Sequence, residues 1–184
     1  ELIRPILRGR DIKKYGYVEN GLFLINTHNG IRGKLPRIDI NDYPAVKAHL
    51  DRYWDKISAR ADKGDTPYNL RNCAYLEDFN KPKIIYPDIC TFLSFELDTS
   101  CFYLSNTAYF LITEKEEHLK YFLRVLNSSV MDWYYRTLSV QLGEKAVRMF
   151  SIYVLNIPIP PISDEPIEEI LKLSKEEKLF ISGS

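Results

Sequence analysis

The sequence predicts an α+β fold, a small twisted sheet, mostly antiparallel or mixed, packed with helices. Three observations support this prediction. β-prone runs cluster near the N-terminus and between residues 82 and 112, and helical periodicity falls between and after them. The 184 residues suffice for one domain, or one domain plus an arm. Hydrophobic residues at 45% and charged residues at 27% exclude a disordered or collagen-like chain.

The first 40 residues predict a hairpin and then a basic loop. Asn20-Gly21 lies between β-prone residues in 17–27, which favours a two-residue hairpin turn because both turn positions need positive φ. A second Asn-Gly pair and Gly33 predict a loop over 28–37. This loop carries three cations in six residues, namely Arg32, Lys34 and Arg37.

Residues 44–61 predict an amphipathic helix. Pro44 suits its first turn, and Asn41 and Asp42 precede it as capping candidates. Apolar side chains recur at spacings of three and four: Val46, Leu50, Tyr53, Trp54, Ile57 and Ala61. Because the opposite face is charged, we expect this helix to pack against the core with a solvated back.

Residues 65–112 predict a polar loop followed by strands. The loop, 65–80, contains Arg71 and Asn72. The apolar run between Pro82 and Pro87 favours a short buried strand. The β-prone runs that follow are divided by turn-forming residues, which predicts a meander. These runs are 91–97, 101–104 and 107–112.

The remaining residues predict mostly helices. Thr113 and Glu116 fit a capping box for a helix that ends at Asn127-Ser128-Ser129, and this tripeptide can cap a second segment. A polar loop over 139–149 contains Gln141, Lys145 and Arg148, and residues 150–154 favour a strand. Ser163 opens a last amphipathic helix whose exposed face is acidic.

The formal net charge of zero hides an asymmetry. Residues 1–90 carry 16 basic and 12 acidic side chains, whereas residues 91–184 carry 9 and 13. Most of the excess of acidic side chains in residues 91–184 lies in the tail after residue 163, so the body of the chain is mildly basic. This excess is compatible with a polyanionic partner but does not require one.

The sequence lacks the local signatures of common catalytic sites. Its glycines form neither a Walker loop nor a dinucleotide-type or S-adenosylmethionine-type turn. Asp88 is followed by no nearby Glu/Asp-x-Lys triplet, which disfavours a metal-dependent nuclease. The three His and three Cys show no metal-ligand spacing. We therefore expect a binding module with no catalytic residues and no metal.

The start of the chain and its cysteines predict the cellular compartment of the protein. The chain starts at Glu1 with no leader, so we expect a piece of a longer protein without a signal peptide. The odd number of cysteines favours reduced thiols in the cytoplasm. No apolar run is long enough to span a membrane, and no membrane partner is expected.

Five short stretches, in order, resemble the C-terminal target-recognition domain of TaqI-like adenine DNA methyltransferases and fused type IIG restriction–modification enzymes. The resemblance extends from about residue 2 to about residue 173. The stretches are Leu7-Arg8-Gly9-Arg10-Asp11-Ile12 with Tyr15, Tyr43-Pro44-Ala45-Val46 with Leu50 and Arg60, Lys81-Pro82-Lys83-Ile84-Ile85-Tyr86-Pro87, Leu126-Asn127-Ser128 with Tyr134-Tyr135, and Ile157-Pro158-Ile159-Pro160.

The resemblance implies a target-recognition domain over 1–162, followed by a C-terminal amphipathic helix and tail over 163–184. It also implies a missing upstream methyltransferase domain, which would bind S-adenosylmethionine, whereas this fragment would bind none. The partner would be double-stranded DNA, for which cations hold phosphates and a few side chains reach base edges. The expected DNA-binding residues are Arg32, Lys34, Arg37, Arg71, Asn72, Gln141, Lys145 and Arg148.

Two alternatives remain open from the residues alone. One is a protein-interaction or scaffold module that does not bind nucleic acid, and the other is a nuclease centred on Asp88. For each cation, the alternative role is that of an exposed, solubilising charge. The stretches between the motifs match no family pattern, so the recognised DNA sequence does not follow from the resemblance.

Overall fold

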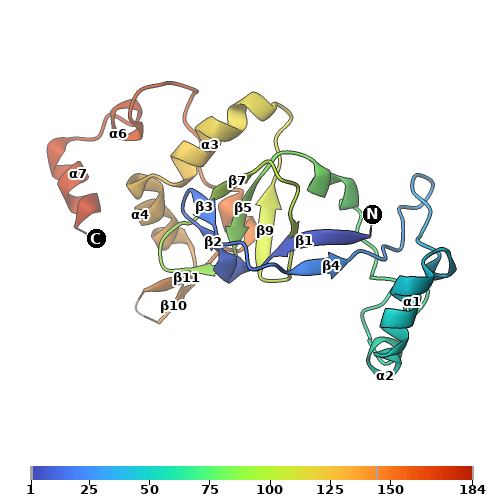
Figure 1. Ribbon diagram of the computed structural model, residues 1–184. Helices are drawn as coiled ribbons and strands as arrows, with labels where there is room; N and C mark the ends of the chain where they lie inside the picture. Colours follow the sequence, from blue (N-terminus) through green and yellow to red (C-terminus); the bar gives the residue numbers. More distant parts are fainter. Residues whose placement is uncertain (1, 144, 184) are drawn as a thin grey trace. The chain divides into compact units, whose positions relative to one another are not determined.

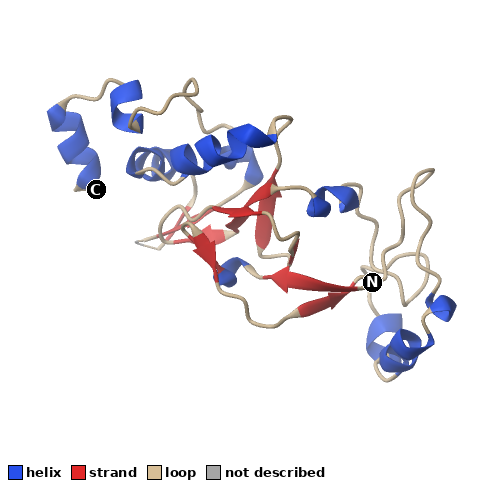
Figure 2. Ribbon diagram, turned by 45° about the horizontal axis from the view of Figure 1, so that its top comes forward, coloured by secondary structure: helices blue, strands red, loops and turns tan. Residues whose placement is uncertain are grey.

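The computed structural model describes residues 2–143 and 145–183 and confirms the α+β class (Figures 1 and 2). The α-helices are α1 (Pro44–Asp51), α2 (Trp54–Ser58), α3 (Leu119–Leu126), α4 (Ser129–Leu138), α5 (Ser151–Val154), α6 (Ile167–Ile170) and α7 (Lys175–Ser182). The strands are β1 (Ile3–Leu7), β2 (Ile12–Lys13), β3 (Gly16–Tyr17), β4 (Phe23–Ile25), β5 (Lys83–Pro87), β6 (Ile89–Cys90), β7 (Glu96–Asp98), β8 (Tyr103–Leu104), β9 (Ala108–Leu111), β10 (Gln141–Leu142) and β11 (Ala146–Arg148).

The chain folds into two compact units. Unit 1 comprises Glu1–Pro5 and Phe23–Phe79, and unit 2 comprises Ile6–Leu22 and Asn80–Ser184. Strand β1 belongs to both units. Its first three residues pair antiparallel with β4, and its last two pair parallel with β8.

Unit 2 is built around β5, which lies between β7 and β9 in an antiparallel sheet (Figure 1). All five residues of β5 are buried, as the apolar run between two prolines predicted. Helix α3 packs against β5 and β7 because it buries one apolar face that includes Leu119 and Val125. Ser128 caps α4 by accepting a hydrogen bond from the Met131 amide, which confirms the predicted break between α3 and α4.

Two strand-pairing predictions are wrong. Asn20-Gly21 does not join paired strands: β3 pairs with β2 around Lys14-Tyr15, and β4 pairs with β1. The residues after β5 do not form a meander, because β7 and β9 flank β5 while β8 pairs with β1. For β4 and β8, the more distant strand β1 replaces the local partner that the turn signals favoured, whereas β3 pairs with the preceding strand β2.

Three helix predictions also need correction. Residues 44–61 form two short helices with no buried residue, and Tyr53 and Trp54 are 46% and 44% exposed, so they are not a core-packing helix. Residues 150–154 form α5 with its N-cap, Phe150, and not a strand. A short apolar run does not by itself distinguish a helix from a strand. The tail after residue 163 forms two helices, α6 and α7, not one.

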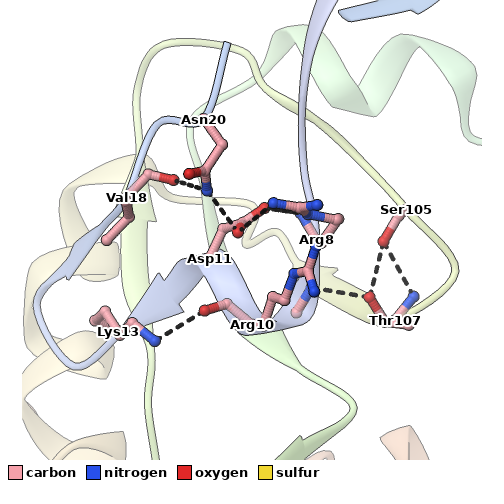
Figure 3. Close-up of polar contacts among 9 residues, drawn as sticks. Arg8, Arg10, Asp11, Lys13, Val18, Asn20, Ser105 and Thr107 are labelled. Atoms are coloured by element: carbon pink, nitrogen blue, oxygen red, sulfur yellow. Dashed lines mark hydrogen bonds and ion pairs between the residues drawn. The ribbon is translucent and has the colours of Figure 1, made fainter. Parts of the chain in front are cut away.

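The first motif of the resemblance is a tightly bonded corner in unit 2 (Figure 3). The buried Asp11 carboxylate accepts hydrogen bonds from the Arg8 guanidinium at 2.9 and 3.0 Å and from the Asn20 amide at 2.7 Å. The Arg8 bonds hold the pKa of Asp11 below its ordinary value. A Cβ on Gly9 would lie 2.1 Å from the Thr107 carbonyl oxygen, so only glycine fits. The motif therefore maintains the fold.

Candidate nucleic-acid interface

The first predicted loop forms a defined projection in unit 1. Ile31 and Leu35 exchange backbone hydrogen bonds of 2.8 and 2.9 Å, which places Arg32, Gly33 and Lys34 at the tip between them. Gly33 has a φ of 74°, a left-handed conformation that favours glycine. Arg32 and Lys34 are exposed.

Four of the predicted residues line one concavity in unit 1. Its volume is about 630 Å³, and the four are Arg32, Lys34, Arg37 and Asn72. Arg71 lies on the same loop as Asn72 and is exposed. The prediction therefore named residues from two separate loops that the fold brings to one surface of unit 1.

Carboxylates accompany three of these cations. Lys34 pairs with Glu77, Arg37 with Asp65 at 3.6 Å, and Arg71 with Asp62 at 3.3 Å. All six side chains are largely exposed, so the pairs contribute little stability and can exchange for other anions. Arg32 has neither a hydrogen bond nor an ion pair within the described part of the chain.

Asn29 organises the polar wall of the concavity. Its Oδ1 accepts a hydrogen bond from the Asp65 backbone N–H at 2.9 Å, which fixes the orientation of its amide. Its Nδ2 donates to Asp65 Oδ1 at 3.0 Å and to Asn72 Oδ1 at 2.7 Å. Asn72 therefore directs its carbonyl oxygen to Asn29, and its own N–H groups have no partner among the described residues.

The third predicted loop is a short hairpin in unit 2. Strands β10 and β11 pair antiparallel, and β11 also pairs with β6. Gln141 and Lys145 are exposed, whereas Arg148 is half-buried with its guanidinium 5.6 Å from the centre of the Phe150 ring. Val147 and Met149 are buried and anchor the base of the hairpin in the core.

A family model described as the TaqI-like C-terminal specificity domain matches residues 4–159. The chain belongs to this family. The match contains all eight predicted DNA-binding residues and ends before α6 and α7. The TaqI-like specificity domain is a component of restriction–modification enzymes.

A specificity domain is not expected to bind a cofactor of its own. In residues 2–143 and 145–183, no cluster of three or more His, Cys, Asp or Glu side chains could hold a metal ion. None of the helices in these ranges has the length and apolar character needed to cross a membrane.

Sequence reasoning missed two residues that shape the specificity domain's candidate interface. Asn29 was interpreted only as part of a turn, although its side chain connects Asp65 and Asn72. Arg136 was not singled out, although it binds the third loop through the Lys145 carbonyl oxygen at 3.0 Å. No local sequence signal indicates these contacts, because Asp65 and Asn72 lie far from Asn29 in the chain and Lys145 lies outside the helix that carries Arg136.

Proposed function

We propose that this specificity domain recognises a particular sequence in double-stranded DNA and supplies target selectivity to a separate catalytic domain. That domain would be an adenine-specific, S-adenosylmethionine-dependent DNA methyltransferase, alone or fused to an endonuclease in a type II restriction system. The family match over residues 4–159 is the observation that carries the proposal. The loops described above supply the residues that would contact DNA.

The organisation of the chain follows from the same proposal. Residues 1–162 would form the target-recognition part, and 163–184 a C-terminal helical tail. The catalytic domain would precede this chain in a cytoplasmic parent protein. It would hold the other side of the duplex and take the target base out of the stack, as base-modifying enzymes must.

The unpaired cations are the first choice for phosphate contacts. Arg32 in unit 1 and the Lys145 ammonium in unit 2 are exposed and have no carboxylate partner among the described residues. A phosphate can bind either one without displacing a protein anion. Lys34, Arg37 and Arg71 would exchange a carboxylate for a phosphate, which makes their net contribution smaller.

Asn72 is suited to contact a base edge that accepts hydrogen bonds. Because Asn29 engages its carbonyl oxygen, Asn72 offers N–H donors to an incoming ligand. In the major groove, guanine presents the acceptors N7 and O6, and thymine presents O4. Adenine presents the acceptor N7 as well, but a bidentate contact to adenine would require Asn72 Oδ1 to accept a second hydrogen bond beside the one from Asn29.

Binding of the chain to duplex DNA across a salt series tests the proposal. Affinity should fall steeply with salt, by about 0.9 in logarithmic slope for each phosphate contact. Arg32→Gln should lower the slope by about 1. Lys178→Gln in the tail, which removes a cation paired with Glu169, is the matched control and should leave the slope unchanged. If neither the chain nor its parent bound DNA at low salt, a protein-interaction module would be the better assignment.

Selection from a randomised duplex library tests the role of Asn72. Asn72→Asp replaces donors with acceptors, so the base preferred at one position should change from guanine or thymine to a donor-bearing base. Each base contact of this kind provides about 1–3 kcal/mol of discrimination. An unchanged consensus would exclude Asn72 from base recognition.

A further inference from the structure

The outer part of the β10–β11 hairpin has little intrinsic stability. Strand β10 has two residues and lies at the edge of the three-stranded sheet β10-β11-β6. So short an edge strand adds little stability of its own. Val147 and Met149 are buried and anchor β11, but Gln141, which lies opposite Val147 on β10, and Lys145, which precedes β11, are exposed. Something else must fix their position if they are to contact DNA reproducibly.

Arg136 of α4 provides that connection. Its Nε donates to Asp132 Oδ2 at 2.9 Å, its Nη1 to the Lys145 carbonyl oxygen at 3.0 Å, and its Nη2 to the Thr91 carbonyl oxygen. The rigid guanidinium fork thus joins three segments of unit 2, as a lysine ammonium could not. The guanidinium also lies 5.7 Å from the centre of the Phe92 ring.

This arginine is engaged by the protein rather than available to DNA. Its side chain is only 25% exposed, and its carboxylate partner Asp132 also accepts a hydrogen bond from the Leu93 amide at 2.6 Å. These bonds use three of the five N–H groups of the guanidinium and hold it against the protein. The hairpin is therefore the main route by which Arg136 would influence DNA binding.

Two neighbours on the same end of α4 hold the other side of the hairpin. The buried Tyr135 hydroxyl donates to the Arg148 carbonyl oxygen at 2.7 Å, and the Ser139 hydroxyl donates to the same oxygen at 2.5 Å. Helix α4 thus binds the hairpin at Lys145 and at Arg148. A recognition site needs this type of support, because small displacements of contacting side chains reduce specificity.

We infer that Arg136 is a positioning residue for DNA specificity, which fixes the β10–β11 hairpin so that Gln141, Lys145 and Arg148 meet the duplex in one register. The inference rests on the proposed function. It assigns to Arg136 an effect on the discrimination between sequences, and no effect on the number of phosphate contacts.

Arg136→Lys tests the inference, because it keeps the charge and removes the fork. Arg124→Lys is a matched control: Arg124 also binds two backbone carbonyls, those of Ser163 and Asp164, and lies 5.3 Å from the centre of the Tyr121 ring. Amide hydrogen exchange of the free chain should be about tenfold faster at 141–142 and 146–148 in Arg136→Lys alone. Exchange in β5 should be unchanged, which verifies the fold.

DNA binding supplies the second measurement. The affinity ratio between a duplex selected from a random library and an unrelated duplex should fall about tenfold in Arg136→Lys, with the salt slope unchanged. Arg124→Lys should retain the wild-type ratio. Wild-type exchange and a wild-type ratio in Arg136→Lys would overturn the inference.

The exchange measurement separates this inference from the proposed function. If the wild-type chain showed no sequence preference, the proposed function would fail and the assignment to specificity would fail with it. Faster exchange of the hairpin in Arg136→Lys would then still establish the connection itself, because that measurement requires no DNA.

Discussion

The two units are stabilised by different means. Unit 2 has a large apolar core, which includes Ile84, Phe95, Val125 and Met149, each completely buried. Both units bury polar side chains, but the apolar clusters of the described residues lie in unit 2. The buried Asn26, Thr27 and Asn69 therefore make up a larger share of the interior of unit 1. Apolar burial is non-directional, whereas a buried polar group costs free energy unless it is paired.

Asn69 is the centre of unit 1. Its side chain donates to the Ile38 carbonyl oxygen at 3.0 Å and accepts from the Thr66 hydroxyl at 2.6 Å. Its backbone carbonyl accepts from Gly64 at 2.9 Å and from Arg60 at 3.2 Å. These bonds connect segments that carry the first two basic loops. Unit 1 thus holds exposed loops in place with few apolar residues, and this makes it sensitive to the loss of single hydrogen bonds.

The two tryptophans allow the units to be followed separately. The chain contains two, Trp54 in α2 of unit 1 and Trp133 in α4 of unit 2. In a Trp133→Phe background, fluorescence reports on unit 1, and in a Trp54→Phe background it reports on unit 2. These two backgrounds distinguish the unfolding of unit 1 from that of unit 2.

The largest effect should come from the buried ion pair of unit 2. Lys83 Nζ lies 2.5 Å from Asp98 Oδ2, and both side chains are completely buried. Lys83→Ala would leave the Asp98 carboxylate buried without its cation, which costs about 3–5 kcal/mol. Denaturant unfolding monitored at Trp133 should show this loss.

Arg71→Ala in unit 1 is the contrasting variant for that prediction. It breaks the pair with Asp62, whose two side chains are 67% and 69% exposed, so the loss should be below about 1 kcal/mol. Lys83→Ala should therefore lose much more unfolding free energy than Arg71→Ala. Equal losses would contradict the view that the ion pair of unit 2 is shielded from water and that of the unit 1 loop is not.

The next effect compares one buried asparagine from each unit. Asn69→Ala should destabilise unit 1 by about 2 kcal/mol, because it leaves buried backbone groups unpaired. Its counterpart in unit 2 is Asn127, whose side chain exchanges hydrogen bonds of 2.9 and 3.0 Å with the Phe95 backbone. Asn69→Ala should change the transition seen at Trp54, and Asn127→Ala the transition seen at Trp133. A single transition shared by both probes would show that the units unfold together.

Elements with a strong local pattern were predictable. The buried strand β5 follows from the run Ile84-Ile85-Tyr86 between Pro82 and Pro87, and the start of α4 follows from Ser128 as its cap. The helix expected over 44–61 divides into α1 and α2, and no residue of its apolar stripe within these helices is buried. Periodicity describes one face of a helix but not what lies opposite it.

The candidate interface was predictable in its cations but not in their partners. Lys34 could be named from a basic loop, yet Glu77, which pairs with it, comes 43 residues later. Arg136 lies four residues after Asp132 on a helix, a spacing typical of a surface ion pair, and nothing local indicates its bond to Lys145. The sequence therefore overstates the free positive charge of unit 1 and misses the support of the hairpin in unit 2.

The smallest expected effect is a pH dependence confined to unit 1. His28 Nδ1 accepts a hydrogen bond from the Gly30 N–H at 3.2 Å, and burial lowers the pKa of His28 below its ordinary value. Because the folded state then binds the proton more weakly than the unfolded state, stability from this group is complete above about pH 6.5 and decreases as the pH falls below that value. Protonation removes the acceptor, so the loss should approach the net value of one hydrogen bond, about 1 kcal/mol.

Unfolding monitored at Trp54 between pH 7.5 and 5 should reveal this decrease, and unfolding monitored at Trp133 should show it less or not at all. His28→Asn keeps an acceptor for Gly30 and has no proton to gain in this range. The free energy of unfolding that Trp54 reports for this variant should therefore be constant between pH 7.5 and 5. If His28→Asn retained the wild-type pH dependence, another group in unit 1 would be responsible. If the dependence were equal at both probes, the polar centre of unit 1 would not be the more sensitive of the two interiors.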